Sequence, residues 1–300
     1  MSQPIVTGVA RQSVLVDLSI RIYTGRRLDR STQEEVQHAK GAASRRAASV
    51  YKSLFAECKE LDAITKIQSA ARLTHYKMTM PWSDNGSRLL PILALQNYQT
   101  RMNEFRDEFD ILVGRFLDRY DTLVAAAAFQ LGALFNRDEY PTREKVRSRF
   151  AFDVALTPLP TAGDFRIEAE SELQRDLIEQ YEARTQRMVE AAQRDAWTRL
   201  HTALTHMVER LTDKEDGKKN RIFDTLVSNP TELCALLTAF NITNDPALER
   251  ARVQLENILA GTSADELRKY PDARADVKQR VENILSQYDW GTIDDEEDAA

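Results

Sequence analysis

The sequence contains few of the residues that mark secreted or loop-rich proteins. Its 300 residues include two cysteines, ten glycines and nine prolines. Two cysteines exclude a disulfide scaffold, and the first ten residues have neither the basic nor the apolar region of an export signal. Scarce glycine and proline favour long helices over a loop-rich β fold. We therefore expect a protein of a reducing cytoplasm.

Long apolar runs and known catalytic motifs are also missing. The longest apolar runs, residues 89–95 and 123–129, fall far short of the roughly 20 residues that a membrane helix needs. There is no glycine-rich phosphate loop, nucleophile elbow or HExxH motif. His201 and His206 are five residues apart, which is not the spacing of a shared metal on a helix. We expect a non-enzymatic protein without a cofactor, a metal or a membrane span.

Charge is unevenly distributed along the chain. The formal net charge is −6, and the last twelve residues contain six acids and no base, so the rest of the chain is balanced. Residues 21–52 contain eight bases and three acids. A basic segment joined to an acidic end predicts a polyanionic partner and an internal competitor for that partner.

Apolar periodicity predicts two strands and three long helices. Residues 14–22 and 146–156 alternate apolar and polar side chains, as half-buried strands do, and we expect them to pair. Helices are expected over 31–76, about 98–134 and about 165–211. In the second helix the apolar spacing is that of a coiled-coil seam. The seam residues are Tyr98, Met102, Phe105, Phe109, Leu112 and Phe116.

Helix-start signals mark three further helices near the C-terminus. Asn229–Pro230, Asp245–Pro246 and Ser263 with Glu266 are each typical of an N-cap, which predicts helices over 231–240, 246–260 and 264–288. The expected fold is mainly α: an elongated antiparallel coiled-coil bundle of long helices, a small two-stranded β element and a C-terminal helical module. The expected domains are a core over 1–213, the module over 214–288 and a disordered acidic tail over 289–300.

Several short motifs resemble a phage and plasmid family of formally unknown function. They are LSIRIYTGRR at 18–27, MPW at 80–82, RLLP at 88–91, LP and GDF at 159–165, and FNITNDP at 240–246. The resemblance implies the role of a single-stranded-DNA-binding RNA polymerase cofactor, as found in short-tailed phages, with a fold unlike the OB barrel. Plasmid relatives beside MoxR-type ATPase genes imply a different role, that of an ATPase adaptor.

The predicted DNA-binding surface combines cations with one aromatic ring. If the two strands pair, cations from both lie on one outer face, and Tyr23 supplies a ring on which a base can stack. The alternative is that Arg45, Arg46 and Lys52 are simply the solvated face of a long helix. The candidate residues are Arg21, Tyr23, Arg26, Arg27, Arg30, Lys40, Arg45, Arg46, Lys145, Arg147 and Arg149.

The acidic end has two interpretations. It is either a solubility extension or a segment that folds back on the basic surface and is released to a partner when DNA binds. In the second case Trp290 and Ile293 anchor the partner beside Asp294, Asp295, Glu296 and Glu297. The expected function is single-stranded DNA binding in phage transcription or replication, in the cytoplasm of an infected bacterium, with phage RNA polymerase as a partner. The alternative is a helical adaptor that bridges proteins. Self-association is left open.

Overall fold

The structure, a computed structural model of the chain, describes residues 5–42, 44, 46–83, 86–160, 172–213 and 220–290. These residues form eleven α-helices, two 3₁₀ helices and six strands, in two compact units. Unit 1 comprises Met1–Asp17, Tyr76–Tyr98 and Leu156–Ala300, and unit 2 comprises Leu18–His75 and Gln99–Ala155. The units therefore have other bounds than the domains predicted from the sequence.

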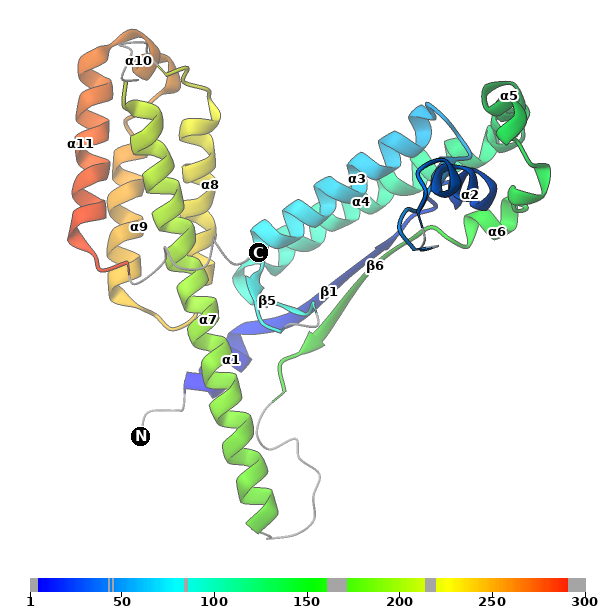
Figure 1. Cartoon of the computed structure of the whole chain (residues 1–300). Coiled ribbons are helices and arrows are strands. Elements are labelled where there is room, and N and C mark those ends of the chain that lie inside the picture. Colours follow the sequence, from blue (N-terminus) through cyan, green and yellow to red (C-terminus); the bar gives the residue numbers. More distant parts are fainter. Residues whose placement is uncertain are drawn as a thin grey trace. The chain divides into compact units, whose positions relative to one another are not determined.

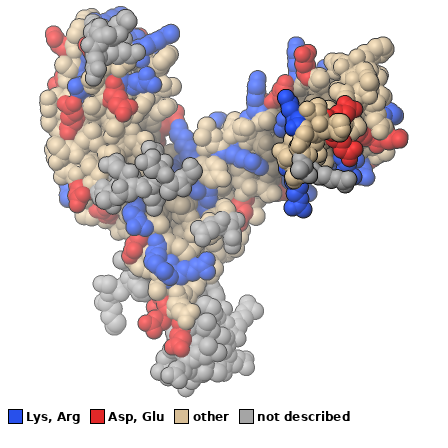
Figure 2. Space-filling model, in the orientation of Figure 1, with Lys and Arg blue, Asp and Glu red and all other residues tan. Residues whose placement is uncertain are grey.

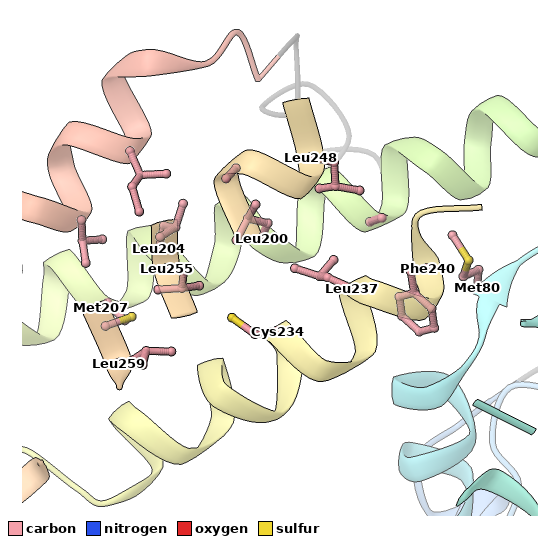
Figure 3. Packing of buried hydrophobic residues seen from close by; sticks show 14 of the residues in the cluster. Met80, Leu200, Leu204, Met207, Cys234, Leu237, Phe240, Leu248, Leu255 and Leu259 are labelled. Carbon is pink, nitrogen blue, oxygen red and sulfur yellow. The ribbon is translucent and has the colours of Figure 1, made fainter. Parts of the chain in front are cut away.

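Unit 1 is built around a long central helix. Its elements are α1 (Ile5–Gln12), β4 (Met80–Pro81), β5 (Arg88–Pro91), α7 (Glu172–Leu211), α8 (Thr225–Phe240), α9 (Pro246–Leu259), α10 (Ala264–Lys269) and α11 (Pro271–Gln287). Helix α7 packs against α8 and α11, and α9 packs against the same two helices (Figure 1). Apolar side chains fill the space between them, among them Leu200, Leu204, Leu237 and Leu255, which are fully buried (Figure 3).

Unit 2 is held together by a cluster of aromatic rings. Its own elements are β2 (Arg26–Leu28), α2 (Arg30–Ala39), β3 (Tyr51–Ser53), α5 (Tyr120–Leu131), η1 (Gly132–Leu134), η2 (Arg137–Glu139) and α6 (Arg143–Arg147). The ring centroid of Phe55 lies 5.7 Å from those of Phe116 and Tyr120 and 5.4 Å from that of Tyr140. Such edge-to-face contacts stabilise a core beyond the apolar area they bury.

The remaining four elements, β1 (Ser13–Arg21), α3 (Lys59–Met78), α4 (Ile92–Asp118) and β6 (Ala151–Pro158), contribute residues to both units. The strand order is β4-β5-β1-β6, and β5 pairs antiparallel with both β1 and β4. Strands β2 and β3 form a separate antiparallel ribbon. The predicted pairing between the segments around 14–22 and 146–156 is confirmed by the neighbours β1 and β6, although β6 begins only at Ala151.

The predicted coiled-coil bundle is wrong, because the chain forms a mixed arrangement of helices, a four-stranded sheet and a ribbon. The apolar stripe of α4 is real: Tyr98, Met102, Phe109 and Phe116 are buried. In unit 2, however, this stripe meets rings from other segments, since Phe109 packs against Phe152 at 5.7 Å and Phe116 against Phe55. An apolar stripe of this width can pack into a core of helices and strands as well as into a coiled-coil seam.

The helix predicted over 31–76 is divided by a loop and strand β3, which lie between α2 and α3. Gly41 has φ +63°, its N–H donates to His38 O at 3.1 Å, and Ala42 N–H donates to Gln37 O at 2.9 Å. This is the Schellman arrangement that ends a helix. The helix also begins slightly earlier than the predicted residue 31, because Asp29 is the N-cap and its side chain accepts from Thr32 N–H.

Two of the three predicted helix starts near the C-terminus are confirmed. Asp245 caps α9 by accepting from Ala247 N–H, and Pro246 is its first residue. Ser263 and Glu266 form a reciprocal capping box on α10. Pro230 is not a start, because it lies inside α8. The helix predicted over 264–288 is divided into α10 and α11 by Pro271.

A charged cluster ties α7 to the C-terminal end of α3 within unit 1. The Arg199 guanidinium donates to the carbonyl oxygens of Lys77 and Thr79 at 2.7 and 2.8 Å, and also to Tyr76 O at 3.1 Å. Its Nε lies 2.8 Å from Asp195 Oδ2. One arginine thus satisfies carbonyl groups that the end of a helix leaves without donors.

Candidate nucleic-acid interface

Unit 2 is the positively charged unit. It contains 20 lysines and arginines against 16 aspartates and glutamates, whereas unit 1 contains 21 against 31. Figure 2 shows Lys and Arg atoms on the surface of unit 2, with Asp and Glu atoms among them. The basic character predicted for residues 21–52 therefore belongs to a unit that is basic as a whole.

A groove in unit 2 collects basic residues from β2 and from the start of α2. It has a volume of about 880 Å³ and lies between the segment from β2 to the start of α2 and the segment η1–η2. Its lining residues are Arg26, Arg27, Leu28, Asp29, Arg30, Ser31, Lys52, Ala133, Leu134, Phe135, Asn136 and Glu139. Three of the predicted cations, Arg26, Arg27 and Arg30, thus share one groove.

Local sequence explains how the three arginines are placed. Gly25 has φ +60°, a conformation that favours glycine, and this turn starts the ribbon strand that carries Arg26 and Arg27. Asp29 then caps α2, and Arg30 is the first residue of that helix. All three arginines are exposed, and none has a carboxylate partner among the described residues. They are free to bind an anion.

Lys52 joins the two walls of the groove instead of offering its charge to a ligand. Its ammonium lies 2.8 Å from Glu139 Oε2 and 3.5 Å from Asp29 Oδ2, and it donates to Leu134 O at 2.8 Å. Burial lowers the pKa of Lys52, but the two carboxylates outweigh burial and raise it above the ordinary value. The pKa of Asp29 is lowered by hydrogen bonds from Ser31 and Thr32 and by Lys52. Lys52 thereby connects both walls of the groove.

Tyr23 is not the exposed ring that the sequence predicted. Its exposed fraction is 6%, and its ring packs edge-on against Phe55 at 6.3 Å and Phe150 at 6.4 Å. Burial raises the pKa of its hydroxyl, against the opposing effects of Arg149 and Arg27. The strand ends at Arg21, so the inside–outside alternation that placed Tyr23 on the outer face stops two residues too early. Tyr23 is a core residue and cannot stack a base.

The other predicted cations lie outside the groove. Arg21, Lys40, Arg46, Lys145 and Arg147 are exposed on unit 2, and Arg46 lies in the loop after α2 instead of on a helix face. Arg149 is also exposed and lies over the ring of Tyr23, with its guanidinium carbon 5.5 Å from the centre of that ring. Arg45 lies outside the described residues.

Trp290 belongs to the packing of unit 1 and is not a free anchor. Its indole N–H donates to Leu285 O at 2.7 Å, and its ring lies 5.5 Å from Trp197 and 5.0 Å from His201. Trp290 is thus half-buried in unit 1, and its role as an anchor for a partner stays a prediction. The other predicted partner residues, Ile293, Asp294, Asp295, Glu296 and Glu297, lie outside the described residues.

Sequence reasoning missed half of the groove. Leu134, Phe135, Asn136 and Glu139 form the wall opposite the arginines. Asn136 caps η2 by accepting from Asp138 N–H, which is the one local signal for a turn at this place. Nothing in the sequence indicates that this turn faces residues more than a hundred positions earlier.

The described residues give no sign of a metal cluster or a membrane span. No three His, Cys, Asp or Glu side chains gather in a way that could hold a metal ion in this part of the chain. His201 instead stacks beside Trp290, and His206 pairs with Arg210 at 3.2 Å. Within the same residues, no helix has the length and apolar character needed to cross a bilayer. Cys58 and Cys234 are both buried, as is typical of free cysteines in a protein core.

Comparison with family models, curated proteins and solved structures finds no match to this chain. The family resemblance therefore rests only on the motifs quoted from the sequence. Any function must be argued from the groove itself.

Proposed function

We propose that the chain is a non-enzymatic single-stranded-DNA-binding protein that acts in phage transcription or replication. The observation that carries the proposal is the groove of unit 2, where Arg26, Arg27 and Arg30 are exposed and have no carboxylate partner within the described part of the chain. Unpaired arginines hold phosphates through charge-assisted hydrogen bonds. The motif resemblance to a phage family supports the same function, with phage RNA polymerase as the partner and the infected bacterial cytoplasm as the location.

The lining of the groove favours a single strand over a duplex. Apolar side chains, Leu28, Leu134 and Phe135, lie in the same groove as the arginines. A single strand offers both phosphates and unstacked bases, so it can use both kinds of lining. A duplex keeps its bases stacked and offers mainly phosphates and groove edges.

Fluorescence anisotropy with single- and double-stranded oligonucleotides over a range of salt tests the proposal. Each phosphate contact on a single strand contributes about 0.7 to the slope of log affinity against log salt, so four to six contacts give a slope of roughly −3 to −4. We expect this slope and tighter binding to single strands. No measurable affinity for single strands at low salt would contradict the proposal.

An adaptor that bridges proteins, including an ATPase partner, is the second candidate. It is favoured by α5 and η1, where Phe129 is 91% and Leu134 43% exposed. These residues lie in the stretch 122–136, which has no charged side chain. Exposed apolar surface of this kind often marks protein interaction. Tight binding to a protein partner without any affinity for single strands would favour the adaptor.

Removal of the acidic end tests whether it competes for the groove. A chain that ends at Trp290 keeps the packing of Trp290 against Trp197 but loses five acids, which changes the formal charge from −6 to −1. We expect tighter binding to single strands, with the largest gain at low salt, where screening is weakest. The measurement is the same anisotropy titration.

A second variant separates charge from chain length. In the full chain, Asn or Gln replaces the five acids, Asp294, Asp295, Glu296, Glu297 and Asp298. It should bind as tightly as the shortened chain if charge is the cause. If both variants bind as the unmodified protein does, the acidic end is a solubility extension.

A further inference from the structure

The exposed ring of Tyr51 is the most informative feature that the groove does not explain. Tyr51 is 61% exposed on β3, in the ribbon whose other strand carries Arg26 and Arg27. No hydrogen bond or ring contact of its side chain occurs among the described residues. Large aromatic rings are more often partly covered, so a ring this exposed beside unpaired cations calls for an explanation.

The register of the ribbon places Tyr51 beside a groove arginine. Tyr51 lies opposite Leu28, and Ser53 lies opposite Arg26. Residues directly opposite in an antiparallel pair share a face, and so do residues two apart along a strand. Tyr51 and Arg26 are therefore diagonal neighbours on one face, a separation that an aromatic and a long side chain can span.

The same register explains how one nucleic-acid strand can contact both the Tyr51 ring and the groove. Arg27 and Lys52 are opposite each other on the second face of the ribbon, where Lys52 reaches Asp29 and Glu139. Arg26 lines the groove and also shares the face of Tyr51. A nucleic-acid strand whose phosphates lie on Arg26 and Arg27 passes within reach of the Tyr51 ring.

We propose that Tyr51 stacks one unpaired base of the bound single-stranded DNA and makes the site selective for single strands. This inference rests on the proposed function of the groove. Aromatic rings stack bases without regard to sequence, because every base offers a π face. A base inside a duplex is already stacked on its neighbours, so it cannot use the ring unless the duplex opens. The selectivity of the site then comes from Tyr51 and the affinity mainly from the arginines.

The test compares ring variants on two probes, a labelled oligothymidine and an abasic oligonucleotide of the same length. Tyr51→Ala should weaken oligothymidine binding roughly 5- to 150-fold, leave the salt slope unchanged and leave abasic binding unchanged. Tyr51→Phe, which keeps a ring, should bind like the unmodified protein. Tyr270→Ala, which removes a ring that is 58% exposed in unit 1, should have no effect on either probe.

Further outcomes show whether the stacking role of Tyr51 is wrong or the proposed DNA-binding function is wrong. If Tyr51→Ala lowers the melting temperature, Tyr51→Leu keeps apolar bulk without a ring and should still lose oligothymidine affinity. If oligothymidine binding is intact in Tyr51→Ala and Tyr51→Leu but lost when the groove arginines are removed, the stacking proposal is overturned and the function stands. If neither the ring nor the arginines affect binding, both are overturned.

Discussion

Replacement of Arg26, Arg27 and Arg30 together by alanine is expected to weaken single-stranded DNA binding on the order of 100-fold at moderate salt. The salt slope should also become shallower by about 2, because three phosphate contacts of about 0.7 each are lost. The melting temperature should hardly change, since exposed arginines contribute little to folding. Anisotropy titrations and thermal denaturation measure the two effects separately.

A triple variant in unit 1 provides the matched control. Arg184, Arg187 and Arg250 are exposed, so their replacement by alanine changes the net charge by the same amount without touching the groove. This control should retain most of the affinity. Equal losses in the two variants would mean that total charge, and not the groove, governs binding. Unfolding of the groove variant would show that the three arginines are structural.

Arg199→Ala is expected to lower the free energy of unfolding by roughly 2–4 kcal/mol, the largest stability effect we predict for a single polar residue. The change removes the Arg199 donor from the carbonyl oxygens of Lys77 and Thr79, of which Thr79 O still accepts from Arg88, and it leaves Asp195 without its closest partner. Urea denaturation measures the loss. Arg194→Ala, an exposed neighbour on the same helix, is the control and should change stability little.

The loss of unfolding free energy in Arg199→Ala should depend on pH in a defined direction. Burial raises the pKa of Asp195 above the ordinary 3.8, and Arg199 opposes this effect, so removal of Arg199 raises the pKa further. At a pH between the pKa of Asp195 in the unfolded chain and its higher pKa in the folded variant, the folded variant holds a proton on Asp195 that the unfolded chain has released. Its stability should therefore fall as the pH rises through that window. A loss that is the same at acidic and neutral pH would contradict this role of Asp195.

Local signals in the sequence predicted those features of the fold that depend on neighbouring residues. The alternation at 14–22 identified β1, and the caps at Asp245 and Ser263 identified the starts of α9 and α10. In each case the side chains that decide the structure lie within a few residues of each other. The pairing of β1 with β6 was also predicted, but the strands β4 and β5 of the same sheet and the β2–β3 ribbon were not.

Features that depend on distant residues were not predicted. The helix predicted over 31–76 ran through Gly41, yet α2 ends there and the chain continues to β3, which pairs with β2. Tyr23 was placed outside by an alternation that the turn at Gly25 interrupts. The second wall of the groove comes from η1 and η2, and no local pattern connects these turns to Arg26.

The interrupted course of the chain decides how the basic unit can be isolated. Unit 2 is made of two segments separated by Tyr76–Tyr98, which belongs to unit 1. No single truncation can therefore release it. A minimal unit 2 polypeptide would run from Leu18 to Ala155 with a short linker in place of Tyr76–Tyr98, and it would cut all four shared elements, β1, α3, α4 and β6. Domain dissection of this protein is thus a problem of loop replacement rather than of trimming termini.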